Sequence, residues 1–143
     1  MRIGIQRRSA IKTEVTFWSA KFPPYEGEEE RINPGLWGQR LAECLSRSLP
    51  KHGVEVGDPI AEDWGWVVPI KNKRFNMWIG CGHHADADDA MGCFIKPHKP
   101  RVWRLFGRID TTADITRVAD ALDKILRAAP DIREITWSLA GQS

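Results

Sequence analysis

Residues 111–130, TTADITRVADALDKILRAAP, constrain the possible folds of this chain more than any other segment. Their apolar residues recur every three or four positions, which is the spacing of an amphipathic helix that buries one face. These residues are Ile115, Val118, Leu122, Ile125 and Leu126. Thr112 is a suitable N-terminal cap, Asp114 lies near the positive end of the helix dipole, and Pro130 ends the helix. The sequence therefore predicts a helix over residues 112–129 that must pack against another element.

A second helix is predicted in the segment NPGLWGQRLAECLSRSLPKHG, which begins at Asn33. Asn33 is a good N-terminal cap and Pro34 suits the first helical position. Pro50 would end the regular helix, and Gly53 could adopt the left-handed exit. The stripe at helical spacing consists of Trp37, Leu41, Cys44, Leu45 and Ser48. The preceding residues 23–30, PPYEGEEE, are expected to form a solvated acidic loop.

Segments rich in β-branched and aromatic residues outnumber the helices. The predicted strands are 13–22, 64–68, 74–82, 101–109 and 133–139. Two helices cannot cover both faces of so wide a sheet, so we expect a single α+β domain over 1–143. In this two-layer sandwich, an antiparallel sheet carries both helices on one face. The order strand, helix, strands, helix resembles the TATA-binding-protein-like and helix-grip folds, a fold-level likeness that implies no function.

Alternation along the strands separates two faces of the predicted sheet. The face toward the helices is expected to carry Phe75, Met77, Ile79, Cys81, Trp103, Leu105 and Ile109. The opposite face would then hold Trp78, Arg104, Phe106 and Arg108. Trp64 and Trp66 share a face with each other, and the strand register decides which face that is.

Tryptophans beside arginines on a solvent-facing sheet favour a contact surface, because both residue types dominate binding hot spots. The candidate binding residues are therefore Trp64, Trp66, Trp78, Arg104, Phe106 and Arg108. In an equally compatible interpretation, the arginine stems only cover aromatic rings and nothing binds.

A cysteine- and histidine-rich segment, residues 81–98, is the main candidate for chemistry. It has neither the Cys-x2-Cys nor the His-x3-His spacing that zinc sites use, and its aspartates do not follow the EF-hand layout. We therefore expect a polar, partly mobile connection between strands, with no metal and no cofactor. His83, His84 and Asp86 remain candidate contact residues, since histidine titrates near neutral pH.

The cysteines of this segment are expected to be reduced. Cys81 shares the predicted core face, and a disulfide with Cys93 is conceivable across a hairpin. The N-terminal residues do not resemble an export signal, so a reducing cytoplasmic location, of bacterial type, is expected.

The 143 residues carry a net charge of only +2 and contain no apolar run of membrane-spanning length. Nucleic acid is therefore a disfavoured partner and a membrane is not expected. The favoured function is a non-enzymatic binding module with a protein or peptide partner, followed by a flat aromatic or anionic small molecule. The alternative is a metal- or cysteine-dependent enzyme centred on residues 81–98, with the acid pair Glu62 and Asp63 as a lesser catalytic candidate.

Overall fold

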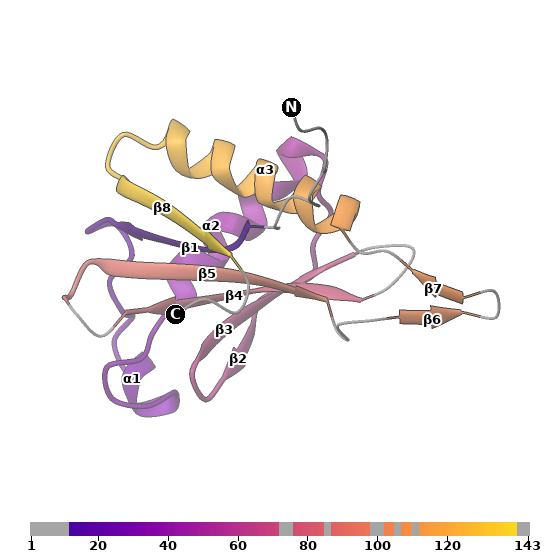
Figure 1. The fold of residues 1–143 in the computed structure, drawn as a ribbon. Coiled ribbons are helices and arrows are strands. Elements are labelled where there is room, and N and C mark those ends of the chain that lie inside the picture. The colour runs from indigo at the N-terminus through magenta and orange to yellow at the C-terminus, as the bar shows by residue number, and fades with distance from the viewer. Residues whose placement is uncertain are drawn as a thin grey trace.

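A computed structural model describes residues 12–71, 76–84, 87–97, 102–104, 107–109 and 112–139. The main strands are β1 (Lys12–Trp18), β2 (Ile60–Glu62), β3 (Gly65–Ile70), β4 (Met77–His83), β5 (Ala90–Pro97) and β8 (Arg133–Leu139). They form an open antiparallel sheet of six strands in the order β2-β3-β4-β5-β1-β8 (Figure 1). The helices are α1 (Glu28–Arg31), α2 (Gln39–Ser48) and α3 (Thr112–Ala128), and a 3-10 turn η1 (Leu49–His52) follows α2. The predicted α+β class is confirmed.

Both long helices pack against the same face of the sheet. Alternate residues of β4 and β5 are buried there, and they join the apolar stripes of α2 and α3 in one core. The sheet contributes Val15, Phe17, Val68, Met77, Ile79, Cys81, Met91, Cys93 and Ile95. The helices contribute Leu41, Leu45, Ile115, Val118, Leu122, Ile125 and Leu126. The opposite face of the sheet is free of α2 and α3.

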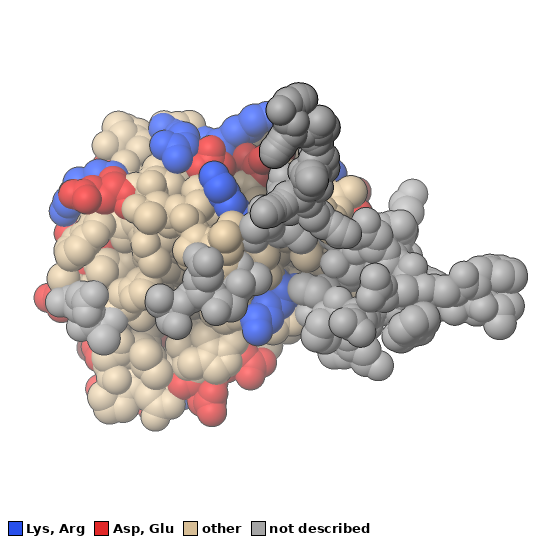
Figure 2. Space-filling view, in the orientation of Figure 1, with Lys and Arg blue, Asp and Glu red and all other residues tan. Residues whose placement is uncertain are grey.

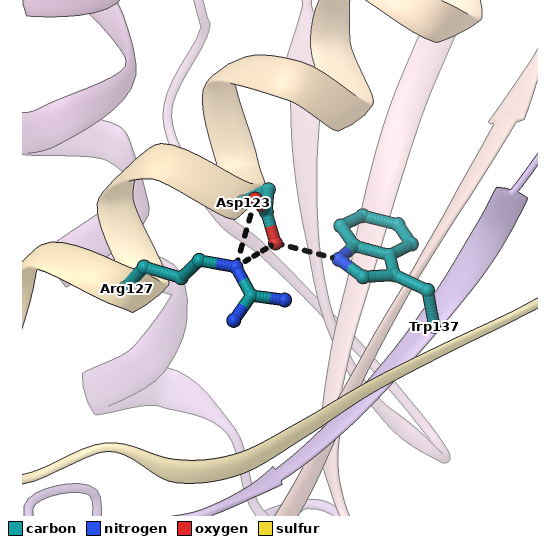
Figure 3. A network of polar contacts seen from close by, with 3 residues as sticks. All are labelled: Asp123, Arg127 and Trp137. Carbon is teal, nitrogen blue, oxygen red and sulfur yellow. Dashed lines mark hydrogen bonds and ion pairs between the residues drawn. The ribbon is translucent and has the colours of Figure 1, made fainter.

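The C-terminal helix and strand agree with the sequence prediction. The stripe of α3 is buried, α3 begins at Thr112 and β8 has the predicted bounds, while the capping role of Thr112 stays a prediction. A polar network joins the two elements (Figure 3). The Trp137 indole N–H donates to Oδ1 of Asp123 at 2.9 Å, and Arg127 Nε donates to both oxygens of that carboxylate.

The predicted start of α2 at Asn33 and Pro34 is wrong, because the helix begins at Gln39. A distant carboxylate replaces the local cap: Oε2 of Glu28 accepts hydrogen bonds from the Gly38 and Gln39 amides, each at 2.9 Å. Gly53 does take the predicted left-handed exit, with φ of 82°.

The expected solvated loop at 23–30 is also corrected, since Glu28 belongs to α1 and is fully buried. Its carboxylate also accepts hydrogen bonds from the Tyr25 amide and the Trp66 indole, both at 2.9 Å. Four donors therefore compensate the burial of this charge.

The cysteine- and histidine-rich segment 81–98 is mostly strand rather than a connection. β4 continues to His83 and β5 begins at Ala90, so the connection covers 84–89. The expected mobile loop is therefore wrong for most of its length.

The predicted strand over 101–109 is wrong as well. β6 (Val102–Arg104) and β7 (Gly107–Ile109) pair with each other in a separate two-stranded ribbon (Figure 1). Trp103 and Ile109 were expected on the face of the main sheet toward the helices, but they belong to this ribbon instead. Phe75, Leu105 and Phe106 lie outside the described residues.

Candidate functional site

Three aromatic rings lie together on the sheet face that the helices leave free. We call Trp64, Trp78 and Phe94 the aromatic cluster. Phe94 lies 5.2 Å from Trp64 and 5.5 Å from Trp78 between ring centroids, and the two tryptophans are 6.1 Å apart. The rings are tilted or edge-on to one another, as attractive aromatic pairs prefer. All three side chains are partly exposed, so the cluster is a surface feature.

Strand alternation explains how two of these rings reach the surface. Trp78 lies between the buried Met77 and Ile79, and its side chain therefore points away from the helices. Phe94 is directly opposite Gly80 on the neighbouring strand. A Cβ on Gly80 would overlap the Phe94 ring, so this glycine provides the space in which the ring lies.

Further apolar side chains extend the cluster toward the edge of the sheet. Ile60 on β2 is opposite Val67, and Val67 is opposite Gly80, so Ile60 and Val67 lie on the same face as the cluster. Ile60 is 49% exposed and is the one exposed large hydrophobic residue among the described residues. An apolar surface thus runs from the edge strand β2 to β5, where monomeric antiparallel sheets usually present polar residues to water.

An open hollow of about 300 Å³ lies beside the aromatic cluster. Gly82 and Gly92, which are paired on neighbouring strands, help to line it, and Gly82 leaves space where another residue would place a side chain. Trp64 and Phe94 line it too, together with Glu14, which is directly opposite Phe94 on β1. The hollow thus combines aromatic rings with a half-buried carboxylate.

Three further polar side chains, those of Thr16, His83 and His84, line the hollow. Thr16 is paired with Gly92 across β1 and β5. The exposed His84 lies over Gly92, since a Cβ on that glycine would come 3.1 Å from the His84 Nε2. Among the described residues, no lysine or arginine makes an ion pair with Glu14.

The structure places only some of the predicted binding residues together. Trp64 and Trp78 belong to the aromatic cluster, but Trp66 points toward the helices and donates its indole N–H to Glu28. The prediction that Trp64 and Trp66 share a face is therefore wrong. Strand alternation applies to Trp66 within β3, whereas Trp64 precedes that strand, in the turn after β2.

The predicted arginines are not on the same sheet as Trp78. Arg104 ends β6 and Arg108 lies in β7, so both belong to the separate ribbon, and their side chains are not among those described. The binding roles predicted for Arg104, Arg108 and Phe106 stay predictions.

His83, the last residue of β4, contacts the segment before α2. The His83 ring stacks on Trp37, with centroids 3.8 Å apart and planes at 16°. Its Nδ1 lies 2.9 Å from the Gly35 carbonyl oxygen and its Nε2 lies 2.7 Å from that of Ala87. Both oxygens are acceptors, so a neutral ring can donate to only one of them. His83 thus connects the 84–89 turn to the segment before α2, and Asp86 lies outside the described residues.

Cys81 and Cys93 face each other across β4 and β5 with their side chains in the core, as predicted for Cys81. Both are free thiols. A hydrogen bond with Cys93, followed by burial, raises the pKa of Cys81 well above its ordinary value. A raised pKa lowers the fraction of the reactive thiolate. The described residues contain no group of three His, Cys, Asp or Glu side chains placed to hold a metal ion.

Charged side chains form no broad patch of one sign on the face seen in Figure 2. Among the described residues, lysine and arginine lie in small groups close to aspartate and glutamate (Figure 2). Within the described part of the chain, no helix combines the length and apolar character needed to cross a membrane.

Sequence reasoning missed two residues of this region, Phe94 and Glu14. The segment AMGCFIKP contained a signal for Phe94. Met91, Cys93 and Ile95 occupy alternate positions, which indicates a strand with these residues in the core and Phe94 on the opposite face. Searches of family models, curated proteins and solved structures find no match to this chain, so the case for the site depends on its own geometry.

Proposed function

We propose that this chain is a non-enzymatic binding module that recognises a protein or peptide partner through the aromatic cluster. The observation that carries the proposal is the contact of three partly exposed rings on the helix-free face, continued by the exposed Ile60. Large aromatic side chains provide much contact area at low entropic cost and are frequent binding hot spots. An apolar surface that is not buried by the chain's own helices favours a partner.

The enzyme alternative centred on 81–98 has less support. The two cysteines of this segment are buried in the core and Cys81 has a raised pKa, whereas a nucleophilic cysteine needs access and a lowered pKa. Glu62 and Asp63, the other acid pair considered, are both exposed. Exposed carboxylates lack the desolvation that tunes catalytic acids.

The finer fold assignment also stays a proposal. The element order β1, α2, β2 to β5, α3 is compatible with a TATA-binding-protein-like or helix-grip-like arrangement, and β8 extends the sheet beyond β1. Such a likeness carries no function, because unrelated functions share common folds.

A capture experiment with matched variants tests the proposed function. Wild-type protein and the variant Trp64→Ala/Trp78→Ala are immobilised and exposed to extract of the source cells, and the retained proteins are quantified by mass spectrometry. A protein retained by the wild type is then purified, and its Kd is measured by calorimetry. We expect Trp78→Ala to weaken that binding by more than about 1 kcal/mol, the scale of a hot-spot residue.

The matched control is Lys124→Ala, an exposed residue of α3 on the other side of the molecule. It should leave the Kd unchanged within about twofold, as surface changes outside an interface do. Partners that bind the tryptophan variants as tightly as the wild type would contradict the aromatic cluster as the recognition surface.

A further inference from the structure

We infer that the hollow beside the aromatic cluster receives a cationic side chain, arginine or lysine, from the partner. This inference rests on the proposed function and specifies the chemistry that the partner must present. It concerns Glu14, Trp64 and Phe94, together with the glycines 82 and 92 that line the hollow.

The charge of the hollow favours a cation. Glu14 is half-buried and lines the hollow, yet it has no ion-pair partner among the described lysines and arginines. The described lysines nearest in sheet register, Lys12 and Lys96, do not line the hollow. A partly desolvated carboxylate is stabilised by an opposite charge, and a guanidinium can meet it through two parallel hydrogen bonds.

The aromatic rings favour the same kind of ligand. Trp64 and Phe94 line the hollow beside the carboxylate, and their ring faces attract a cation within about 6 Å of the centroid. The long apolar stem of arginine or lysine can lie along such rings while its charged group reaches the carboxylate. An anionic group would instead be repelled by Glu14.

The hollow has room for an extended side chain. Its volume is about 300 Å³, and it opens on the sheet surface directly beside the aromatic cluster. Gly82 helps to keep it open, because a Cβ there would meet only backbone oxygens at ordinary contact distances, whereas the His84 ring lies over Gly92. A basic residue next to an apolar residue in the partner would thus occupy the hollow and the cluster together.

Small probes test this inference without a known partner. The 15N-labelled protein is titrated with N-acetyl-arginine methylamide, and its amide signals are followed by NMR. N-acetyl-citrulline methylamide serves as the matched neutral probe, since it has nearly the same shape, and N-acetyl-glutamate methylamide serves as the anionic probe. We expect saturable shifts of the Gly82 and Gly92 amides, with the arginine probe binding about tenfold more tightly than citrulline.

The variant Glu14→Gln keeps the size of the side chain and removes its charge. It should abolish the preference for arginine over citrulline while leaving the signals of α3 in place, which shows that the fold is retained. Equal affinity for citrulline, tighter binding of the glutamate probe, or no shift at Gly82 and Gly92 would each overturn the inference. So would arginine binding that Glu14→Gln leaves unchanged.

Failure here can be distinguished from failure of the proposed function. Trp78 belongs to the aromatic cluster but does not line the hollow. A purified partner whose binding depends on Trp78 but not on Glu14 would preserve the proposed function and overturn the cationic specificity. A partner that binds both Trp78→Ala and Glu14→Gln more weakly than the wild type would support the proposed function and the cationic specificity alike.

Discussion

The two faces of strands β4 and β5 use different side chains for different purposes. The inner face carries residues of similar, intermediate size, such as Met77, Ile79 and Ile95, and all are at most 5% exposed. The outer face alternates between the extremes of size, with the large rings of Trp78 and Phe94 beside glycines. Uniform residues fill a core at native density, whereas rings next to glycines create raised and hollow regions. Relief of this kind is useful for recognition and has no value for packing against a flat helix layer.

The largest effect is expected for truncation of the inner layer. Leu122→Ala removes a side chain of α3 that is fully buried against the sheet. It should lower the free energy of unfolding by about 2–5 kcal/mol, because the lost contacts leave a cavity. Urea unfolding followed by circular dichroism measures the change, and a loss below about 0.5 kcal/mol would contradict this packing.

A smaller stability loss is expected on the outer layer. Trp78→Ala removes the contacts of one partly exposed ring with Trp64 and Phe94. Aromatic pairs of this kind contribute about 0.5–1.5 kcal/mol, so unfolding should cost about 1 kcal/mol less than in the wild type. The same urea experiment applies, and a loss as large as that of Leu122→Ala would mean that the two faces do not differ in kind.

Gly80→Ala should affect the outer face with still less change in stability. The new methyl group would displace the Phe94 ring, which is partly exposed and can swing outward by rotation of the whole side chain. The strain is offset in part by the lower entropy of the unfolded alanine chain, so we expect a net loss below about 1 kcal/mol.

The readout that is specific for Gly80→Ala is the position of the Phe94 ring. Ring-current shifts of the Trp64 and Trp78 indole protons should change, and affinity for a cluster-dependent partner should fall. Gly57→Ala is the matched control, because a Cβ there would make only ordinary contacts with Pro69. Unchanged indole signals in Gly80→Ala would show that Phe94 does not depend on this glycine.

The smallest expected effect concerns a thiol on the inner face. The folded state raises the pKa of Cys81 above the ordinary 9.0, so it keeps its proton at a pH where the unfolded chain has lost it. Stability from this group is therefore complete below pH 9.0 and is lost as the pH rises above that value. Unfolding measured from pH 8 to 10.5 should show a shallower alkaline decline in Cys81→Ala than in the wild type, even though the variant is less stable at pH 8.

Tyr25 provides a reference for that measurement. The hydrogen bond to Glu43 raises the pKa of Tyr25 above 10.0, so this group contributes to a decline at higher pH in both proteins. If wild type and Cys81→Ala decline in parallel, the buried thiol makes no contribution to the alkaline loss.

Local periodicity allowed the prediction of those elements whose signals are local. The stripe of α3 and the alternation around Trp78 were sufficient to place them, because spacing alone determines which residues share a face. β5 could not be predicted with the same certainty, because its alternation of Met91, Cys93 and Ile95 is short and its cysteines are also typical of a metal or catalytic site.

Features that depend on long-range contacts could not be predicted. The start of α2 depends on Glu28, which accepts a hydrogen bond from the Gly38 amide ten positions later in the chain. The hollow depends on Glu14 meeting Phe94 across β1 and β5, which are 80 residues apart in this pairing. Apolar and β-branched residues in 101–109 were compatible with a central strand, but their pairing partner is the other half of the same segment.

The buried carboxylate of Glu28 has a consequence for the order in which the chain folds. It receives hydrogen bonds from the segment before α1, from the first residues of α2 and from Trp66 on β3. α2 has no side-chain cap of its own, so as an isolated peptide it would nucleate poorly. The helix becomes stable only when these distant segments have met, which requires loop closure before any gain. α2 and the strand β3 should therefore form together and late, and their amides should share one rate of hydrogen exchange.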